Sequence, residues 1–306
     1  MNGRTFALLL VTWIAFGSVF LAIKIGVGLM PPLLLGAARF LIAGAILYAI
    51  GLRLPNSEPD PIGRRQIWTS VAVGLSLAFV NGMVVLASTQ MDSWLVSVLT
   101  CTIPLWSYGA SVLFAHRPLQ YAEASGVFFG IGGIVVLLWP GHETVHVDLA
   151  LAILLIVGAM VWGGASVWER SAPIPKRSLV AIGLQCMVAG VAFVGWGAAA
   201  GEFAGLNAAV FFTPAALGTI AYLAVVATVL GYGAYMTLIV KTGATIANSF
   251  GYVSPAIAVL LGWAVLHEPV TMRTFAGFAL IVLAVTLIVA PHPLRSTPPL
   301  PHRPHA

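Results

Sequence analysis

The sequence predicts an all-α integral membrane protein in which ten transmembrane helices form an inverted five-plus-five repeat around a central cavity. Composition points to the membrane class, since 60% of the 306 residues are hydrophobic, 8% are charged and the mean hydropathy is +1.01. These values lie far outside those of soluble globular domains. The lengths of the apolar stretches and an internal repeat predict the number and arrangement of the helices.

Ten apolar stretches of roughly 20 residues follow one another along the chain, and a helix of this length crosses about 30 Å of hydrocarbon. The expected spans are residues 5–25, 32–52, 67–88, 93–115, 120–139, 149–169, 178–200, 215–239, 244–266 and 271–290. The first stretch could be a secretory signal, because Arg4 precedes it. We reject that interpretation, since Phe16-Gly17-Ser18 recurs 146 residues later as Trp162-Gly163-Gly164. The first span should therefore stay in the mature protein.

The chain is a tandem duplication. At a shift of 151 residues, Asn81-Gly82 falls on Tyr232-Gly233, and Pro104 falls on Pro255. Each half contains five spans, and an odd number makes equivalent positions point in opposite directions across the membrane. Inverted repeats of this kind place a binding site near the midplane between the halves. We expect a first repeat at 1–140, a periplasmic connector at 141–148, a second repeat at 149–290 and a disordered, proline-rich cytoplasmic tail at 291–306.

Basic residues are distributed unequally between the two sides of the expected bundle. If the N-terminus is cytoplasmic, 11 of the 14 lysines and arginines lie on the cytoplasmic side, whereas Lys24 and Arg273 face outward. The positive-inside rule then places both termini in the cytoplasm. The net charge of +5 does not indicate nucleic-acid binding, because the sequence shows no basic cluster or RNA-binding motif.

Polar and aromatic side chains in the middle of spans are candidates for a binding site. Asn81 and Tyr232 would be costly facing lipid, so they should face the bundle interior or a cavity. The indole N–H groups of Trp106 and Trp162 also need partners at this depth. The candidate substrate-binding residues are Asn81, Thr100, Trp106, Trp162, Tyr232, Tyr235, Asn248 and Tyr252. Hydrogen bonding and packing between helices are the alternative for these side chains.

Two prolines at equivalent positions of the repeat are expected to bend their helices. Pro104 and Pro255 each remove a backbone hydrogen bond inside a span. A broken hydrogen-bond ladder is tolerated at membrane depth where protein or a water-filled cavity satisfies it. We therefore expect both kinks to line the cavity and to act in gating, with a purely structural kink as the alternative.

Arg39 is the one basic residue well inside an expected span, about eight residues or ~12 Å from the outer boundary. A cation at that depth costs at least ~2.5–3.5 kcal/mol unless it is compensated. Arg39 could pair with helix-end carbonyls or meet a carboxylate of the substrate. We favour a structural anchor, because span 2 should lie outside the kinked helices that form the cavity.

Other chemistry-bearing residues are few. His142 and His146 have the spacing of a two-histidine helical metal pair, but no third ligand is evident, so a polar outer loop is the simpler interpretation. Apart from Glu123 and Glu169, which lie at the ends of their spans, no carboxylate lies inside an expected span, which argues against a cation–proton antiporter. Cys101 and Cys186 should be free thiols. We therefore expect no metal, no cofactor and no enzyme activity.

Several short motifs recur in the order and spacing of a known family. They are Phe16-Gly17-Ser18, Pro31-Pro32 and Ala38-Arg39-Phe40 in the first half, and Ser254-Pro255, Gly262 and Glu268 in the second. Together they resemble the EamA-type carriers of the drug/metabolite transporter superfamily, and within it bacterial exporters of amino acids and related metabolites, including the YddG type. The resemblance implies that spans 1, 3, 4, 6, 8 and 9 surround the cavity and that spans 5 and 10 are peripheral. It also favours the anchor role of Arg39, whereas Phe16 stands where many members have tryptophan.

The expected function is a secondary transporter that exports small zwitterionic metabolites, among them amino acids including aromatic ones, across the bacterial inner membrane by alternating access. Efflux of neutral drugs or sugars is the alternative within transport. An intramembrane enzyme or a channel would belong to a different class. The expected partners are a small-molecule substrate and the lipid bilayer, with no nucleic acid. We expect a monomer or a weak homodimer, because Gly126 and Gly130 form a GxxxG motif that favours close helix packing and could form a dimer face.

Overall fold

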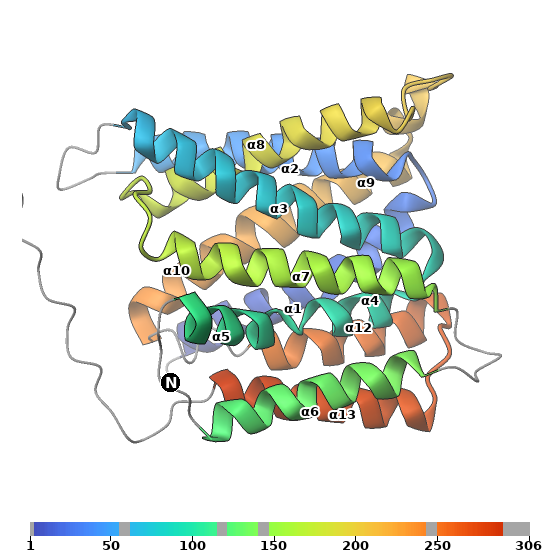
Figure 1. The fold of residues 1–306 in the computed structure, drawn as a ribbon. Coiled ribbons are helices and arrows are strands. Elements are labelled where there is room, and N and C mark those ends of the chain that lie inside the picture. The colour runs from blue at the N-terminus through green and yellow to red at the C-terminus, as the bar shows by residue number, and fades with distance from the viewer. Residues whose placement is uncertain (1–2, 55–61, 115–120, 140–146, 243–249, 290–306) are drawn as a thin grey trace, which may run out of the picture.

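The computed structural model describes residues 3–54, 62–114, 121–139, 147–242 and 250–289 of the chain. These residues form a bundle of helices that run roughly parallel or antiparallel to one another, and no strand occurs among them (Figure 1). Seven helices are long and apolar enough to cross a membrane, and three shorter apolar helices accompany them. The prediction of ten transmembrane helices is therefore confirmed.

The helices begin and end close to the expected positions. The first half contains α1 (Gly3–Val27), α2 (Pro32–Arg53), α3 (Arg64–Gln90), α4 (Ser93–Thr100), α5 (Ile103–Phe114) and α6 (Tyr121–Leu138). The second half contains α7 (Leu149–Glu169), α8 (Ser178–Ala199), the 3-10 helix η1 (Ala208–Phe212), α9 (Pro214–Ala221), the π-helix η2 (Tyr222–Leu230), α10 (Gly231–Thr242), α12 (Phe250–Leu266) and α13 (Met272–Val289). The fourth span is thus divided between α4 and α5, and the eighth runs through α9, η2 and α10.

The two halves interlock through two equivalent contacts. In each contact, the first span of one half packs against the fourth span of the other half. Helix α1 packs on α12, where a Cβ added to Gly17 would lie 2.6 Å from Cβ of Ile257. Helix α7 packs on α5, where a Cβ added to Gly163 would lie 2.9 Å from Cβ of Trp106. Gly17 and Gly163 are equivalent in the repeat, and so are Trp106 and Ile257. This pair of contacts is the packing expected of an inverted repeat, so that prediction is also confirmed.

Helices α6 and α13, the fifth spans of the two halves, pack mainly against each other at one edge of the bundle (Figure 1). A Cβ on Gly126 would lie 2.9 Å from the Ala284 carbonyl of α13, and Gly130 faces the side chain of Leu105 of α5. The GxxxG face is therefore covered within the chain. The interpretation of this motif as a dimer face is wrong, because its small residues serve close packing inside one molecule.

Charged side chains cap helix ends at the face predicted to be periplasmic. Glu202 accepts hydrogen bonds of 3.0 Å from two N–H groups in the first turn of α2. Glu268 accepts 2.8 Å bonds from both the backbone N–H and the hydroxyl of Ser93, at the start of α4. Arg273 donates to two carbonyls at the end of α6, and Lys24 donates to the carbonyl that follows α3. Anions at helix N-termini and cations at C-termini satisfy orphan backbone groups and the helix dipole.

Candidate functional site

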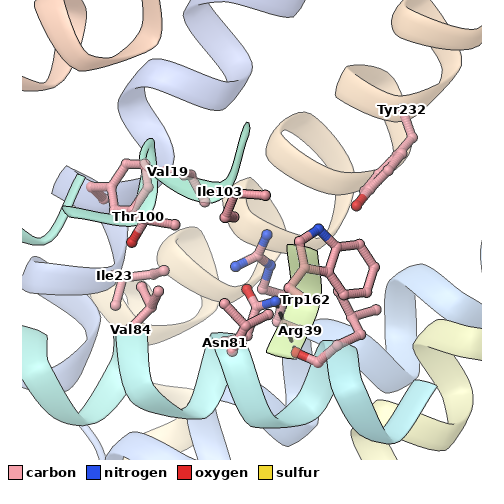
Figure 2. A pocket seen from close by; sticks show the side chains of 12 residues that line it. Val19, Ile23, Arg39, Asn81, Val84, Thr100, Ile103, Trp162 and Tyr232 are labelled. Carbon is pink, nitrogen blue, oxygen red and sulfur yellow. Dashed lines mark hydrogen bonds between the residues drawn. The ribbon is translucent and has the colours of Figure 1, made fainter. Parts of the chain in front are cut away.

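A cavity of about 120 Å³ lies between the two halves, near the middle of the spans (Figure 2). Its walls come from α1, α2, α3, α4, α5, α7 and α10. The lining residues are Val19, Phe20, Ile23, Arg39, Leu77, Val80, Asn81, Val84, Thr100, Ile103, Trp162 and Tyr232. Typical ligand pockets hold about 300–1,000 Å³, so in this conformation the cavity admits only a small solute.

Four of the sequence-predicted binding residues line this cavity, namely Asn81, Thr100, Trp162 and Tyr232. Asn81 donates one N–H to the Leu77 carbonyl of its own helix at 3.0 Å, and the Thr100 hydroxyl donates to the Val96 carbonyl at 2.7 Å. Their side-chain oxygens remain as hydrogen-bond acceptors. Together with the Tyr232 hydroxyl, they give a mostly apolar cavity a few polar groups that can orient a solute.

Arg39 also lines the cavity, so the prediction that span 2 lies outside the cavity wall is wrong. Its side chain is 8% exposed, and Nε donates to the Thr228 hydroxyl at 3.1 Å. The guanidinium carbon lies 4.7 Å from the centre of the Phe40 ring, a favourable cation–π distance. The structure shows no ion pair to Arg39 within the described ranges. The guanidinium therefore brings to the wall of the cavity a positive charge that no acidic side chain of the described residues pairs with.

The π-helix η2 holds the hydroxyl that orients Arg39. Thr228 donates to the carbonyl of Leu223, five residues earlier, at 2.7 Å and accepts from Arg39 at the same oxygen. π-Helical segments are rare and are frequent at functional sites. Thr228 was not among the residues expected from the sequence, although a hydroxyl in the middle of a span was a usable signal. The hydrogen bond between Ser18 of α1 and Tyr222 of η2, which ties the same segment to the first span, was not expected either.

Trp106 was predicted to line the cavity, and it does not. Its indole N–H donates to the Thr102 hydroxyl at 3.1 Å, one helical turn away. Its Cβ occupies the space left by Gly163 at the crossing of α5 and α7. Trp106 thus satisfies its polar group locally, at the break between α4 and α5, and packs the two halves together.

Tyr235 lies outside the cavity wall, in an aromatic cluster with Phe16, Tyr232 and Phe250. The ring of Phe16 lies 5.7 Å from that of Tyr232, 6.3 Å from that of Tyr235 and 4.8 Å from that of Phe250. The cluster joins α1, α10 and α12. Because Tyr232 belongs both to the cluster and to the cavity wall, movement of the cluster would change the shape of the cavity.

The two prolines have different surroundings. Residues Cys101 and Thr102 interrupt the fourth span, and Pro104 lies in the first turn of α5, where a missing N–H removes no helical bond. Helix α12 runs through Pro255 from Phe250 to Leu266 without interruption. A break is therefore present beside the cavity at the first proline, and the bend and gating role at the second stay predictions.

Some predicted residues lie outside the described part of the chain. These are Asn248 and the histidines His142 and His146. Tyr252 lies in α12, but the position of its side chain is not described. Within the described ranges, no three His, Cys, Asp or Glu side chains gather where they could hold a metal ion.

Ten helices in two inverted halves around a small, mostly apolar cavity with a few polar groups are the arrangement of a membrane transporter. Residues 4–139 and 149–290 match the EamA-like transporter family, and the chain belongs to that family. Members of the family are transporters and not enzymes. The family resemblance read from the motifs is thereby confirmed.

The similar proteins are named as transporters, and some of these names also state a substrate class. The uncharacterized inner membrane transporter YedA of Escherichia coli is 31% identical over 285 residues, which are 92% of this chain and 90% of that protein. An Escherichia coli protein named a probable amino-acid metabolite efflux pump is 20% identical over 94% of this chain and 96% of its own length. A crystal structure that is 18% identical covers 94% of this chain and 96% of that chain with a TM-score of 0.60, which supports the fold. The protein is thus a multi-pass transporter of the inner membrane.

Proposed function

We propose that the protein exports small zwitterionic metabolites, amino acids among them, across the inner membrane by alternating access. The observation that carries the proposal is the cavity itself, whose walls combine Asn81, Thr100 and Tyr232 with the flat face of Trp162. Both halves of the inverted repeat contribute to it. Rocking of one half against the other would open such a site to either side in turn.

The fold supplies two irregular segments next to this site. The break at Cys101 and Thr102 separates α4 from α5, and residues on both sides of it line the cavity. The π-helix η2 lies in the eighth span, just before Tyr232. Irregular backbone at membrane depth is expected where it borders a cavity. These segments are the places where the helices can bend as access alternates.

The name of a relative supports the direction and the substrate class, and the distribution of charge supports the orientation in the membrane. A distant relative is named an amino-acid metabolite efflux pump, which supports export of a related solute by this chain. The cationic side chains of the loops favour both termini on the cytoplasmic side. The cavity of about 120 Å³ is smaller than typical ligand pockets, so passage of aromatic amino acids would need the aromatic cluster around Phe16 to move away from Tyr232.

Counterflow in proteoliposomes tests the proposal. Purified protein is reconstituted, vesicles are loaded with one unlabelled amino acid at a time, and uptake of labelled L-alanine is followed. We expect saturable uptake that Asn81→Ala and Tyr232→Phe weaken. Tyr121→Phe is the matched control, because Tyr121 is fully exposed on α6. Absence of saturable uptake for every amino acid, together with transport of a neutral sugar or drug, would overturn the proposal.

A further inference from the structure

Arg39 differs from Arg177 and Arg273 in how it uses its hydrogen-bond donors. Arg273 places Nε and Nη2 on carbonyls at the end of α6, and Arg177 places Nη1 on two carbonyls at the end of α2. Both therefore act as helix caps. Arg39 makes one hydrogen bond, from Nε to Thr228, and its terminal nitrogens have no protein acceptor within the described ranges.

The guanidinium of Arg39 is held in place before any solute arrives. Thr228 fixes Nε, since its own hydroxyl proton is directed to the Leu223 carbonyl. Phe40 lies against the guanidinium at 4.7 Å. The two terminal nitrogens point into the space that Asn81 and Trp162 also face (Figure 2). Two parallel N–H groups on a rigid plane match the two oxygens of a carboxylate.

The cavity wall carries a positive charge and no negative one among its lining residues. Arg39 is the cation among the twelve lining residues, and none of those twelve is an acid. Glu169, at the far end of α7, is engaged by Gln185 at 2.6 Å and does not line the cavity. A buried cation is stabilised when a ligand brings the opposite charge. The wall therefore selects for a negative group on the solute and holds no counter-charge for an ammonium group.

From this arrangement we propose that Arg39 is the carboxylate-binding residue of the cavity and that the solutes are small monocarboxylates, whether or not they carry an amino group. The inference rests on the proposed function, because it takes the cavity to be the transport site. The carboxylate accepts from the terminal nitrogens of Arg39. An amino or hydroxyl group at the neighbouring carbon donates to the oxygens of Asn81 and Thr100. The apolar remainder of the solute lies against Val80, Val84 and Ile103.

Three small molecules test the carboxylate and the amino group of an amino acid separately. L-alanine carries both charged groups, L-lactate keeps the carboxylate and replaces the amine by a hydroxyl, and ethylamine keeps the amine alone. We expect L-alanine and L-lactate to compete with labelled L-alanine in counterflow with half-maximal concentrations within about tenfold of each other, whereas ethylamine does not compete. Ethylamine competing as well as L-alanine would overturn the inference. This comparison uses the unaltered protein, so it does not depend on the folding of a variant.

Substitution of the arginine gives a second test. Arg39→Gln should weaken competition by both carboxylates about 10- to 100-fold, the range for a lost charged hydrogen bond. Arg39→Lys keeps the charge but lacks the planar guanidinium. Its half-maximal concentrations for the two carboxylates should lie between those of Arg39→Gln and those of the unaltered protein. Arg64→Gln is the matched control, since Arg64 is an exposed cation at the start of α3. Elution as a monodisperse peak and an unchanged unfolding midpoint in detergent show that each variant is folded.

The outcomes distinguish this inference from the proposed function. Saturable transport of L-alanine that Arg39→Gln leaves unchanged would overturn the role of Arg39 and retain the carrier. Saturable transport of ethylamine but not of L-lactate would also overturn the role of Arg39 and retain the carrier. If neither L-alanine nor any other amino acid is transported while L-lactate is transported in an Arg39-dependent way, the carboxylate inference stands and the zwitterion proposal fails.

Discussion

Replacement of Gly163 by alanine tests the crossing of α5 and α7 that joins the two halves. A Cβ at this position would lie 2.9 Å from the Ser107 backbone nitrogen and 2.9 Å from Cβ of Trp106. Neither atom is the flexible end of a side chain, so the helices must separate slightly. Overpacking of this kind costs about 1–3 kcal/mol. Alanine also favours the helix over glycine by about 1 kcal/mol, which partly offsets the cost.

The adjacent Gly164 is the control that isolates the steric effect. A Cβ at Gly164 would have no atom within 4 Å, so Gly164→Ala retains only the gain in helix propensity. Gly163→Ala should therefore be less stable than Gly164→Ala by about 1–3 kcal/mol. The free energy of unfolding is measured in mixed detergent micelles with increasing denaturing detergent. Gly17→Ala, the repeat equivalent, should also destabilise the protein, because its Cβ would lie 2.6 Å from Ile257. Equal stability of Gly163→Ala and Gly164→Ala would refute the reasoning.

Three further predictions concern the caps and the cavity. Glu268→Ala should lower the free energy of unfolding in the same detergent assay by about 2–4 kcal/mol, because the backbone N–H and the hydroxyl of Ser93 lose their charged acceptor. Glu268→Gln keeps one acceptor oxygen and should therefore lower the free energy of unfolding by less. A loss below about 0.5 kcal/mol for Glu268→Ala would contradict the capping role. Thr228→Val should raise the half-saturating concentration of a carboxylate about three- to tenfold in counterflow, since Arg39 loses the bond that orients it. It should also lower the free energy of unfolding by about 1–3 kcal/mol, because the buried Nε of Arg39 loses its acceptor. An unchanged half-saturating concentration would remove Thr228 from the site. Phe16→Ala should enlarge the cavity next to Tyr232, so that L-phenylalanine competes better relative to L-alanine. An unaltered ratio of the half-maximal concentrations of the two amino acids would show that the aromatic cluster does not limit solute size.

The spans and their inverted arrangement could be predicted from sequence because their causes are local or internal to the chain. Bilayer thickness sets the length of each apolar stretch, and the spacing of Gly17 and Gly163 marks equivalent crossings. The depth of a residue within the membrane follows directly from its place in a span. This is why Asn81 and Tyr232, both in the middle of their spans, were correctly expected to face the bundle interior.

The direction in which a side chain points around its helix could not be predicted in the same way. In a membrane helix the lipid-facing and protein-facing sides are both apolar, so the pattern of residues carries little information on rotation. Arg39 was placed outside the cavity and Trp106 inside it for this reason, and the structure reverses both. Packing of α2 against the π-helix turns Arg39 toward the cavity, and the break before Pro104 lets Trp106 bond to Thr102.

The sequence by itself determined that this protein is a duplicated, ten-helix membrane transporter, because hydrophobic length and repeat spacing are properties of the linear chain. Only the tertiary structure decided which charges cap helices and which one reaches the cavity. Arg273 and Arg39 are alike as isolated residues in apolar sequence, yet one donates to helix-end carbonyls and the other has terminal nitrogens directed at the cavity. That difference depends on contacts between segments far apart in the chain, such as Thr228 with Arg39, and it exists only once the two halves have packed together.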